Sequence, residues 1–301
     1  MEALEGSYVC HHLWQVEPAE RDAFVARVAP RIRGVVTNGG LGISGGLMRA
    51  LPALEIVAVF GVGVDAVDLD TARARNVRVT NTPDVLTDDV ADLAMALLLA
   101  ANRRICALDR FVRSGAWEEG KDDLVAPPSL RGKTVGIYGF GRIGRTVARR
   151  LEPFGVELRY FQPRPVEGSE VPRARSLLDL AAASDYLVVC AAATLETRGA
   201  IDATVLRALG AEGVLVNVAR GSIVDEPALV EALSTGTLGY AALDVFADEP
   251  RVPGVLRALG NVTLTPHVAS MTVETRDAMG RLVTDNLGAH FAGSELPTPV
   301  V

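Results

Sequence analysis

The stretch TVGIYGFGRIGRTVARRL, from Thr134 to Leu151, decides the fold of this chain. An apolar run leads directly into three glycines with the spacing GxGxxG, and a helix-like pattern follows them. The first glycine permits a tight turn, the second lets a pyrophosphate approach the backbone, and the third lets the helix pack closely on the strand. The pattern therefore predicts a dinucleotide-binding site, with phosphates held at the helix N-terminus. The predicted phosphate contacts are Gly139, Gly141, Arg142, Ile143 and Gly144.

Short apolar runs alternate with helix-like stretches along the whole chain, which is typical of parallel sheets covered by crossover helices. The predicted fold class is α/β, with two Rossmann-like or flavodoxin-like doubly wound parallel-sheet domains. Strands are expected in the second part of the chain at residues 134–138, 156–160, 186–190, 213–217, 239–243 and 262–265. In the first part they are expected at residues 7–13, 34–37, 56–60 and 77–80.

The length of 301 residues favours two domains, because a single core stops growing near about 250 to 300 residues. A long helix is expected from Asp88 to Arg113 as a connector between the domains. A last helix over residues 272–291 is expected to return to the first domain, which makes that domain discontinuous. The predicted division is a substrate-binding domain of residues 1–97 and 286–301 and a dinucleotide-binding domain of residues 98–285.

Composition argues against several kinds of partner. The 30 basic and 37 acidic residues give a formal net charge of −7, which disfavours nucleic acid and anionic membrane surfaces. Neither an export signal nor an apolar run of membrane-spanning length is visible, so a cytoplasmic protein with no membrane partner is expected. The three cysteines lack CxxC spacing, which indicates neither a disulfide framework nor a zinc site. Neighbours in Cys10-His11-His12 point to opposite faces of the expected strand, so no metal is predicted.

Three reactive side chains follow separate strands of the predicted cofactor domain. Arg220 follows the apolar run at 213–217, while Glu249 lies in ALDVFADEP and His267 in LTPHVAS. Ligands bind at the carboxyl ends of strands in such sheets, so these groups are expected to converge. A hydride arriving at a carbonyl carbon builds negative charge on oxygen, which calls for a cation and a proton donor. Arg220 suits a planar carboxylate, and a carboxylate beside His267 favours the protonated imidazole.

The motifs GFGRIG, NVARGSIVDEPALVEAL, ALDVFADEP and LTPHVAS occur in this order. Together they resemble the D-isomer-specific 2-hydroxyacid dehydrogenases, closest to their glyoxylate/hydroxypyruvate reductase branch. The resemblance covers essentially the whole chain. It implies a split substrate domain, a dinucleotide domain and a homodimer formed around the connector helix.

The resemblance also implies residue roles. Arg220 orients the carboxylate and carbonyl of a 2-keto acid, His267 is the general acid in reduction, and Glu249 pairs with His267. The backbone amides of Val62 and Gly63 bind the substrate carboxylate. Asp244 matches the position that contacts the nicotinamide amide, and the residues matching the wall of the nicotinamide pocket are Val218, Ala219, Ala269 and Ser270.

The residue at the end of the second strand of the dinucleotide fold determines the preference between NAD and NADP. An acidic residue is usual about 20 positions after the first glycine, where it holds the ribose hydroxyls of NAD. Here Phe161 stands 22 positions after Gly139, and Gln162 and Arg164 follow. NADP is therefore the expected cofactor, with NAD as the alternative. The resembling branch often carries two adjacent arginines here, whereas this chain has Pro163 before Arg164.

The sequence thus predicts an NADP-preferring 2-hydroxyacid dehydrogenase that reduces small 2-keto acids, such as glyoxylate or hydroxypyruvate, to 2-hydroxy acids. Two enzymatic alternatives are an aryl-pyruvate reductase and a phosphoglycerate dehydrogenase. A non-enzymatic alternative is a dinucleotide-sensing module similar to a corepressor, for which tight cofactor binding without turnover is expected.

Overall fold

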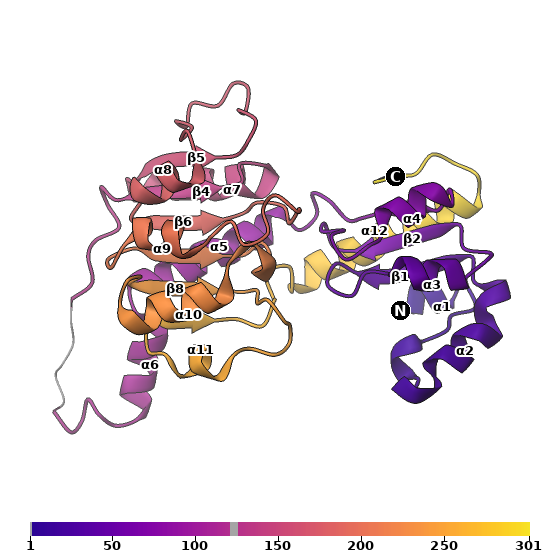
Figure 1. Cartoon of the computed structure of the whole chain (residues 1–301), viewed down its shortest axis with the longest axis horizontal. Coiled ribbons are helices and arrows are strands. Elements are labelled where there is room, and N and C mark those ends of the chain that lie inside the picture. The colour runs from indigo at the N-terminus through magenta and orange to yellow at the C-terminus, as the bar shows by residue number, and fades with distance from the viewer. Residues whose placement is uncertain (1, 121–125) are drawn as a thin grey trace. The chain divides into compact units, whose positions relative to one another are not determined.

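The computed structural model describes residues 2–120 and 126–301. They divide into two compact units, which are described separately (Figure 1). The first unit runs to Leu86 and resumes at Thr272, and the second spans Thr87–Met271. The first unit is therefore discontinuous, as the sequence predicts.

Both boundaries between the units lie earlier in the chain than the sequence predicts. Residues 87–97 belong to the second unit and residues 272–285 to the first. The first difference arises because helix α5 (Thr87–Asn102) packs on helix α7 (Arg142–Leu151) and on strands of the larger sheet. Two ion pairs from Arg150, to Asp88 at 2.9 Å and to Asp92 at 2.6 Å, fasten the start of α5 to α7.

The second unit contains a six-stranded sheet in the order β5-β4-β6-β7-β8-β9, with every pairing parallel. The strands are β4 (Thr134–Tyr138), β5 (Glu157–Phe161), β6 (Tyr186–Val189), β7 (Val214–Asn217), β8 (Tyr240–Leu243) and β9 (Val262–Leu264). All six expected strands are present, and apart from β4 their ends differ from the expected ones by a single residue. The strand order reverses between β4 and β6, which is the position where such sheets bind ligands at their carboxyl edge.

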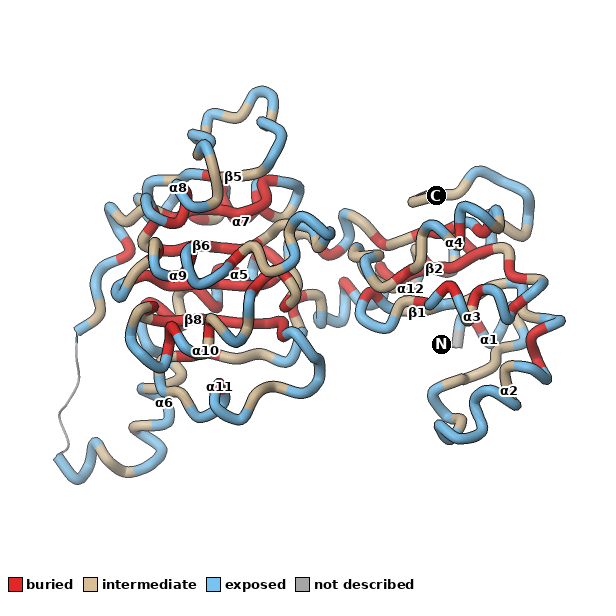
Figure 2. Tube along the Cα trace, viewed as in Figure 1, coloured by how far each residue is buried: buried red, intermediate tan, exposed pale blue. Residues whose placement is uncertain are grey.

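Helices cover both faces of this sheet (Figure 1). Helices α5 and α7 pack together in one layer. The opposite layer contains α8 (Leu177–Ala182), α9 (Ala203–Leu209) and α10 (Glu226–Thr235), and α11 (Gly254–Ala258) packs beside β9. The inner strands β4, β6, β7 and β8 are buried along almost their whole length (Figure 2), whereas the edge strand β5 exposes Glu157 and Arg159. Doubly covered parallel strands read as continuous apolar runs, which explains why the sequence located them well.

The first unit has a smaller parallel sheet in the order β1-β2-β3. Alternate residues of β2 pack into two different hydrophobic clusters. Val57 and Val59 pack in a cluster with Met48, whereas Ile56 packs against Leu287 from the last helix. The elements are α1 (Glu2–Glu5), α2 (Arg21–Val28), β1 (Gly34–Asn38), α3 (Gly45–Ala50), β2 (Ile56–Phe60), α4 (Leu69–Ala74), β3 (Arg78–Thr80) and α12 (Val273–Phe291).

The strand expected at residues 7–13 is wrong. That segment is irregular and ends in a short 3-10 helix, Leu13–Gln15. Tyr8 and Cys10 pack against the cluster that contains Leu287, but Val9 between them is 88% exposed. The alternation of residues facing toward and away from the core therefore resembles that of a strand, although this segment does not pair with β1, β2 or β3.

The single long helix expected from Asp88 to Arg113 is also wrong, because the chain forms two helices. Helix α5 ends at Asn102 and α6 spans Ile105–Arg113. Between them Arg104 adopts a left-handed conformation with φ of 54°, and its guanidinium lies 5.0 Å from the centre of the Tyr240 ring. Three apolar residues of α6 are exposed and form what we call the α6 apolar face: Ile105, Leu108 and Val112.

Across the described part of the chain, every helix is too short or too polar to cross a bilayer.

Candidate active site

The glycine turn joins β4 to α7 and has the shape of a phosphate cradle. Gly139 has φ of 91°, and a Cβ there would lie 2.4 Å from the Ala191 backbone. A Cβ on Gly144 would lie 2.1 Å from the carbonyl oxygen of Gly139. Nothing lies within 4 Å of the position that a Cβ of Gly141 would take, and no side chain caps the N-terminus of α7. Close packing on two sides and open space at the helix N-terminus fit a dinucleotide pyrophosphate.

Gln162 links this turn to the loop after β5. Its side-chain oxygen accepts a hydrogen bond from the Phe140 N–H at 3.0 Å, and its side-chain nitrogen donates to the Arg164 carbonyl at 2.9 Å. A neutral amide thus stands beside the glycine turn where many dinucleotide folds place a carboxylate. The predicted cofactor residues Gln162 and Arg164 are therefore held next to the cradle.

Arg220 follows β7 on a turn that is fixed from two sides. The Asn217 side chain, 1% exposed, accepts from the Ala219 N–H and donates to the Arg220 carbonyl, both at 3.0 Å. A Cβ on Gly221 would lie 2.0 Å from the Phe246 backbone, so this turn packs directly against the turn after β8. That second turn carries Glu249, which brings two of the three predicted catalytic residues together.

Glu249 and His267 form a direct pair. The Nδ1 atom of His267 lies 2.6 Å from Oε2 of Glu249, and Oε1 accepts from the Phe246 N–H at 3.0 Å. Burial acts to raise the pKa of Glu249, but the hydrogen bonds from His267 and Phe246 and the charges of His267 and Arg220 lower that pKa below its usual value. Glu249 is therefore an anion at neutral pH, and His267 presents its Nδ1 proton to it.

The backbone of His267 lies in the left-handed region, with φ of 53°, which is uncommon for a residue other than glycine. Asp244 holds this conformation. Its carbonyl accepts from the His267 N–H at 2.8 Å, and its carboxylate accepts from the Thr265 hydroxyl at 2.6 Å and from the N–H groups of Val268 and Ala269 at 2.9 and 3.0 Å. Backbone strain of this kind persists only where the surroundings fix it.

Asp244 is itself fully buried. Burial raises the pKa of its carboxyl group, although the three hydrogen bonds that it accepts oppose this shift. The carboxylate therefore acts inside the protein as the support of the His267 turn, a role that was not expected from the sequence. Its expected contact with a nicotinamide amide stays a prediction. Of the residues expected to wall the nicotinamide pocket, Val218 and Ala269 are buried and Ala219 and Ser270 are half-buried.

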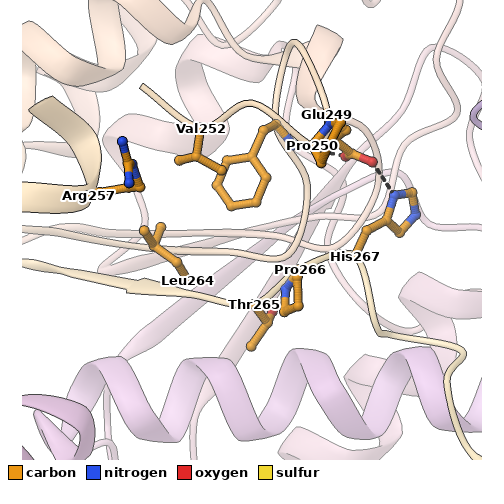
Figure 3. Close-up of a pocket in the computed structure, with 9 residues that line it drawn as sticks. Glu249, Pro250, Val252, Arg257, Leu264, Thr265, Pro266 and His267 are labelled. Carbon is orange, nitrogen blue, oxygen red and sulfur yellow. Dashed lines mark hydrogen bonds and ion pairs between the residues drawn. The ribbon is translucent and has the colours of Figure 1, made fainter. Parts of the chain in front are cut away.

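An apolar pocket of about 260 Å³ opens beside the pair (Figure 3). Glu249 and His267 lie at one end, and Arg257 lies at the other (Figure 3). The walls between them are Phe246, Pro250, Val252, Leu264, Thr265 and Pro266. An apolar body with an acidic group would fit such a space.

The remaining predicted site residues, Val62 and Gly63, lie in the first unit on the loop after β2. The Thr82 hydroxyl accepts from the Gly61 N–H at 3.0 Å, and Asn81 donates to the Val62 carbonyl at 2.8 Å. Within the described ranges, the backbone N–H groups of Val62 and Gly63 donate to no other residue. Adjacent backbone N–H groups on a turn can bind an anion, and the expected contact of Val62 and Gly63 with a substrate carboxylate stays a prediction.

Comparisons with known proteins agree with this architecture. The family model for the NAD-binding domain of D-isomer-specific 2-hydroxyacid dehydrogenases matches residues 95–269. The chain belongs to this family. It is 50% identical over 298 residues to hydroxyphenylpyruvate reductase of Plectranthus scutellarioides, covering 99% of this chain and 94% of that protein. It is 51% identical over 270 residues to glyoxylate/hydroxypyruvate reductase A of Arabidopsis thaliana, covering 90% and 86%.

A solved structure is also similar along most of the chain. It is an NADPH-dependent glyoxylate/hydroxypyruvate reductase from Sinorhizobium meliloti, in complex with NADP and malonate. The identity is 47% and the TM-score is 0.86, covering 96% of this chain and 88% of that one. The predicted family, fold class and oxidoreductase activity are thereby confirmed.

Proposed function

We propose that this dehydrogenase reduces small 2-keto acids, glyoxylate or hydroxypyruvate, to 2-hydroxy acids. The observation that carries the proposal is the 2.6 Å pair of His267 and Glu249 beside the turn of Arg220. When bound, a reduced nicotinamide supplies the hydride. His267 donates the proton to the carbonyl oxygen, and the Glu249 carboxylate holds the imidazole ring through Nδ1. Arg220 stabilises the negative charge that develops on that oxygen.

Substrate binding rests on groups that recognise a carboxylate. The planar guanidinium of Arg220 matches a carboxylate geometrically. We propose that the N–H groups of Val62 and Gly63 on the first unit are also donors suited to a carboxylate. A 2-keto acid carries both the carboxylate and the adjacent carbonyl that these residues require.

The preferred cofactor in this proposal is NADPH, with NADH as the alternative. Gln162 is neutral and Arg164 is exposed and cationic, so the residues directly after β5 favour a 2′-phosphate and place no carboxylate at the position that usually binds the ribose hydroxyls. The relative from Sinorhizobium meliloti is NADPH-dependent and binds NADP, which supports this preference.

Reduction of bulkier aryl pyruvates is a second candidate. It is favoured by the apolar pocket beside the pair, and the relative from Plectranthus scutellarioides is a hydroxyphenylpyruvate reductase. An aromatic ring in that pocket would contact Phe246, Val252 and Leu264.

One spectrophotometric panel tests both candidates. The absorbance of NADPH and of NADH is followed after adding glyoxylate, hydroxypyruvate, phenylpyruvate or hydroxyphenylpyruvate. The leading proposal expects the highest kcat/KM with NADPH and a small acid, whereas faster turnover of the aryl substrates would favour the second candidate. If none of these acids is turned over with either cofactor, both are wrong.

We also propose a homodimer in which a second copy of the chain covers the α6 apolar face. The exposed Ile105 and Val112 would otherwise leave an apolar stripe in water.

The three cysteines are free thiols, which fits a reducing compartment, and we propose the cytoplasm.

A further inference from the structure

The loop that carries Arg164 is unusually constrained. Pro163 and Pro165 flank Arg164, and a residue before proline is restricted to extended conformations. The Tyr160 hydroxyl accepts from the Val166 N–H at 3.0 Å just beyond this segment. The backbone on both sides of Arg164 therefore has few conformations open to it.

Arg173 holds the loop from the other side. Its Nε donates to the Gln162 carbonyl at 3.0 Å, and its Nη2 donates to the Pro163 carbonyl at 2.9 Å. The guanidinium also lies 5.7 Å from the centre of the Phe161 ring. A charged, planar fork thus binds the two carbonyls that immediately precede Arg164, which is a strong and directional arrangement.

The backbone of Arg173 is fixed as well. It forms a parallel bridge with Tyr160 in β5, whose N–H donates to the Pro172 carbonyl at 3.0 Å and whose carbonyl accepts from the Ala174 N–H at 2.8 Å. Arg173 is therefore anchored to the sheet itself and transmits that rigidity to the loop.

The side chain of Arg164 is exposed. Over residues 2–120 and 126–301, neither Arg164 nor Arg173 forms an ion pair with a carboxylate. Both positive charges remain available to an anion at the end of β5. A guanidinium on a fixed backbone loses less conformational freedom when it binds a phosphate than one on a mobile loop.

We infer that Arg173 is a positioning residue for cofactor selection, which holds the Arg164 loop in the conformation that binds the 2′-phosphate of NADPH. This inference rests on the proposed NADPH preference. It assigns the selectivity to two arginines, Arg164 as the group that contacts the phosphate and Arg173 as the group that holds its backbone.

The test measures binding of 2′,5′-ADP and of ADP by calorimetry, so that no catalysis is involved. Four variants are compared with the wild type: Arg173→Lys, Arg164→Met, the double variant that combines these two substitutions, and Arg175→Met. Arg175→Met is the control, because it removes a nearby exposed arginine. Lysine keeps the charge but not the planar fork. We expect Arg173→Lys to weaken binding of 2′,5′-ADP, relative to binding of ADP, by roughly tenfold. This factor corresponds to the loss of one hydrogen bond to a charged group. ADP affinity, which also reports correct folding, stays at the wild-type level.

Dependence on Arg164 is the decisive feature. In the Arg164→Met background, Arg173→Lys should not change the ratio of 2′,5′-ADP affinity to ADP affinity any further. Arg175→Met should leave this ratio at the wild-type value. An unchanged ratio in Arg173→Lys, or a full effect of that substitution without Arg164, overturns the positioning role. If the wild type itself binds both nucleotides equally, the proposed NADPH preference fails together with this inference.

Discussion

Among the individual residues, His267 has the clearest predicted effect. His267→Ala removes the proton donor, so kcat for reduction should fall by about 10²- to 10⁴-fold. The Kd for NADPH, measured by fluorescence, should stay at the wild-type value because the glycine turn is untouched. His290→Ala is the matched control, since His290 pairs with Glu55 at 3.2 Å in the first unit. Wild-type turnover by His267→Ala would remove this residue from the mechanism.

Glu249 has a predicted signature in the pH profile. Its lowered pKa means that the carboxylate stays ionised until the pH falls below the usual glutamate range of about 4.3. The Glu249 carboxylate therefore remains a charged hydrogen-bond acceptor for His267 throughout the neutral range, and this acceptor is lost only at acidic pH.

Glu249→Gln removes that anion at every pH. The rate of reduction by the variant should then be lower than the wild-type rate throughout the neutral range, because His267 loses the ionised partner that holds its Nδ1 edge. The measurement is kcat/KM for glyoxylate reduction between pH 5 and 9, in steps of roughly half a pH unit. Superimposable pH profiles for both proteins would contradict the proposed role of the pair.

For the secondary-structure elements, the contact of β4 with α7 decides cofactor binding. In Gly144→Ala the new Cβ would meet the Gly139 carbonyl oxygen at 2.1 Å, which forces the helix away from the turn. We expect loss of dinucleotide binding and a decrease in the free energy of unfolding of about 1 to 3 kcal/mol.

Gly280→Ala is the control for Gly144→Ala. Gly280 lies in α12, and nothing lies within 4 Å of its Cβ position, so alanine should raise stability by about 0.5 to 1 kcal/mol. Chemical denaturation and NADPH titration of both variants make the comparison. Intact binding by Gly144→Ala would show that the close approach is not required.

For the whole molecule, the prediction concerns assembly. Leu108→Asp places a charge in the middle of the α6 apolar face, which would be desolvated if a second copy covers it. The molar mass from light scattering should change from dimer to monomer. Leu195→Asp serves as the control, because Leu195 is 86% exposed outside that face. A dimer that survives Leu108→Asp, or a monomeric wild type, would refute the proposed interface.

The sequence by itself determined the parts that depend on local patterns. Apolar runs identified the inner strands of the larger sheet, because strands covered on both faces have no polar side. The GxGxxG spacing located the phosphate cradle. The order of Arg220, Glu249 and His267 after separate strands indicated one edge of the sheet, and the structure joins Glu249 to His267 there.

Only the tertiary structure decided the features that depend on contacts between distant segments. The segment expected to form the first strand is irregular in the structure. The expected connector helix is divided into two helices at Arg104, whose guanidinium lies over Tyr240. The structure also revealed Asp244 as the support of the His267 turn and Arg173 as the support of the Arg164 loop. A local pattern records which side of an element is buried. The partners of a buried carboxylate or a guanidinium fork are set by which loops meet, and that is fixed only when the whole chain has folded.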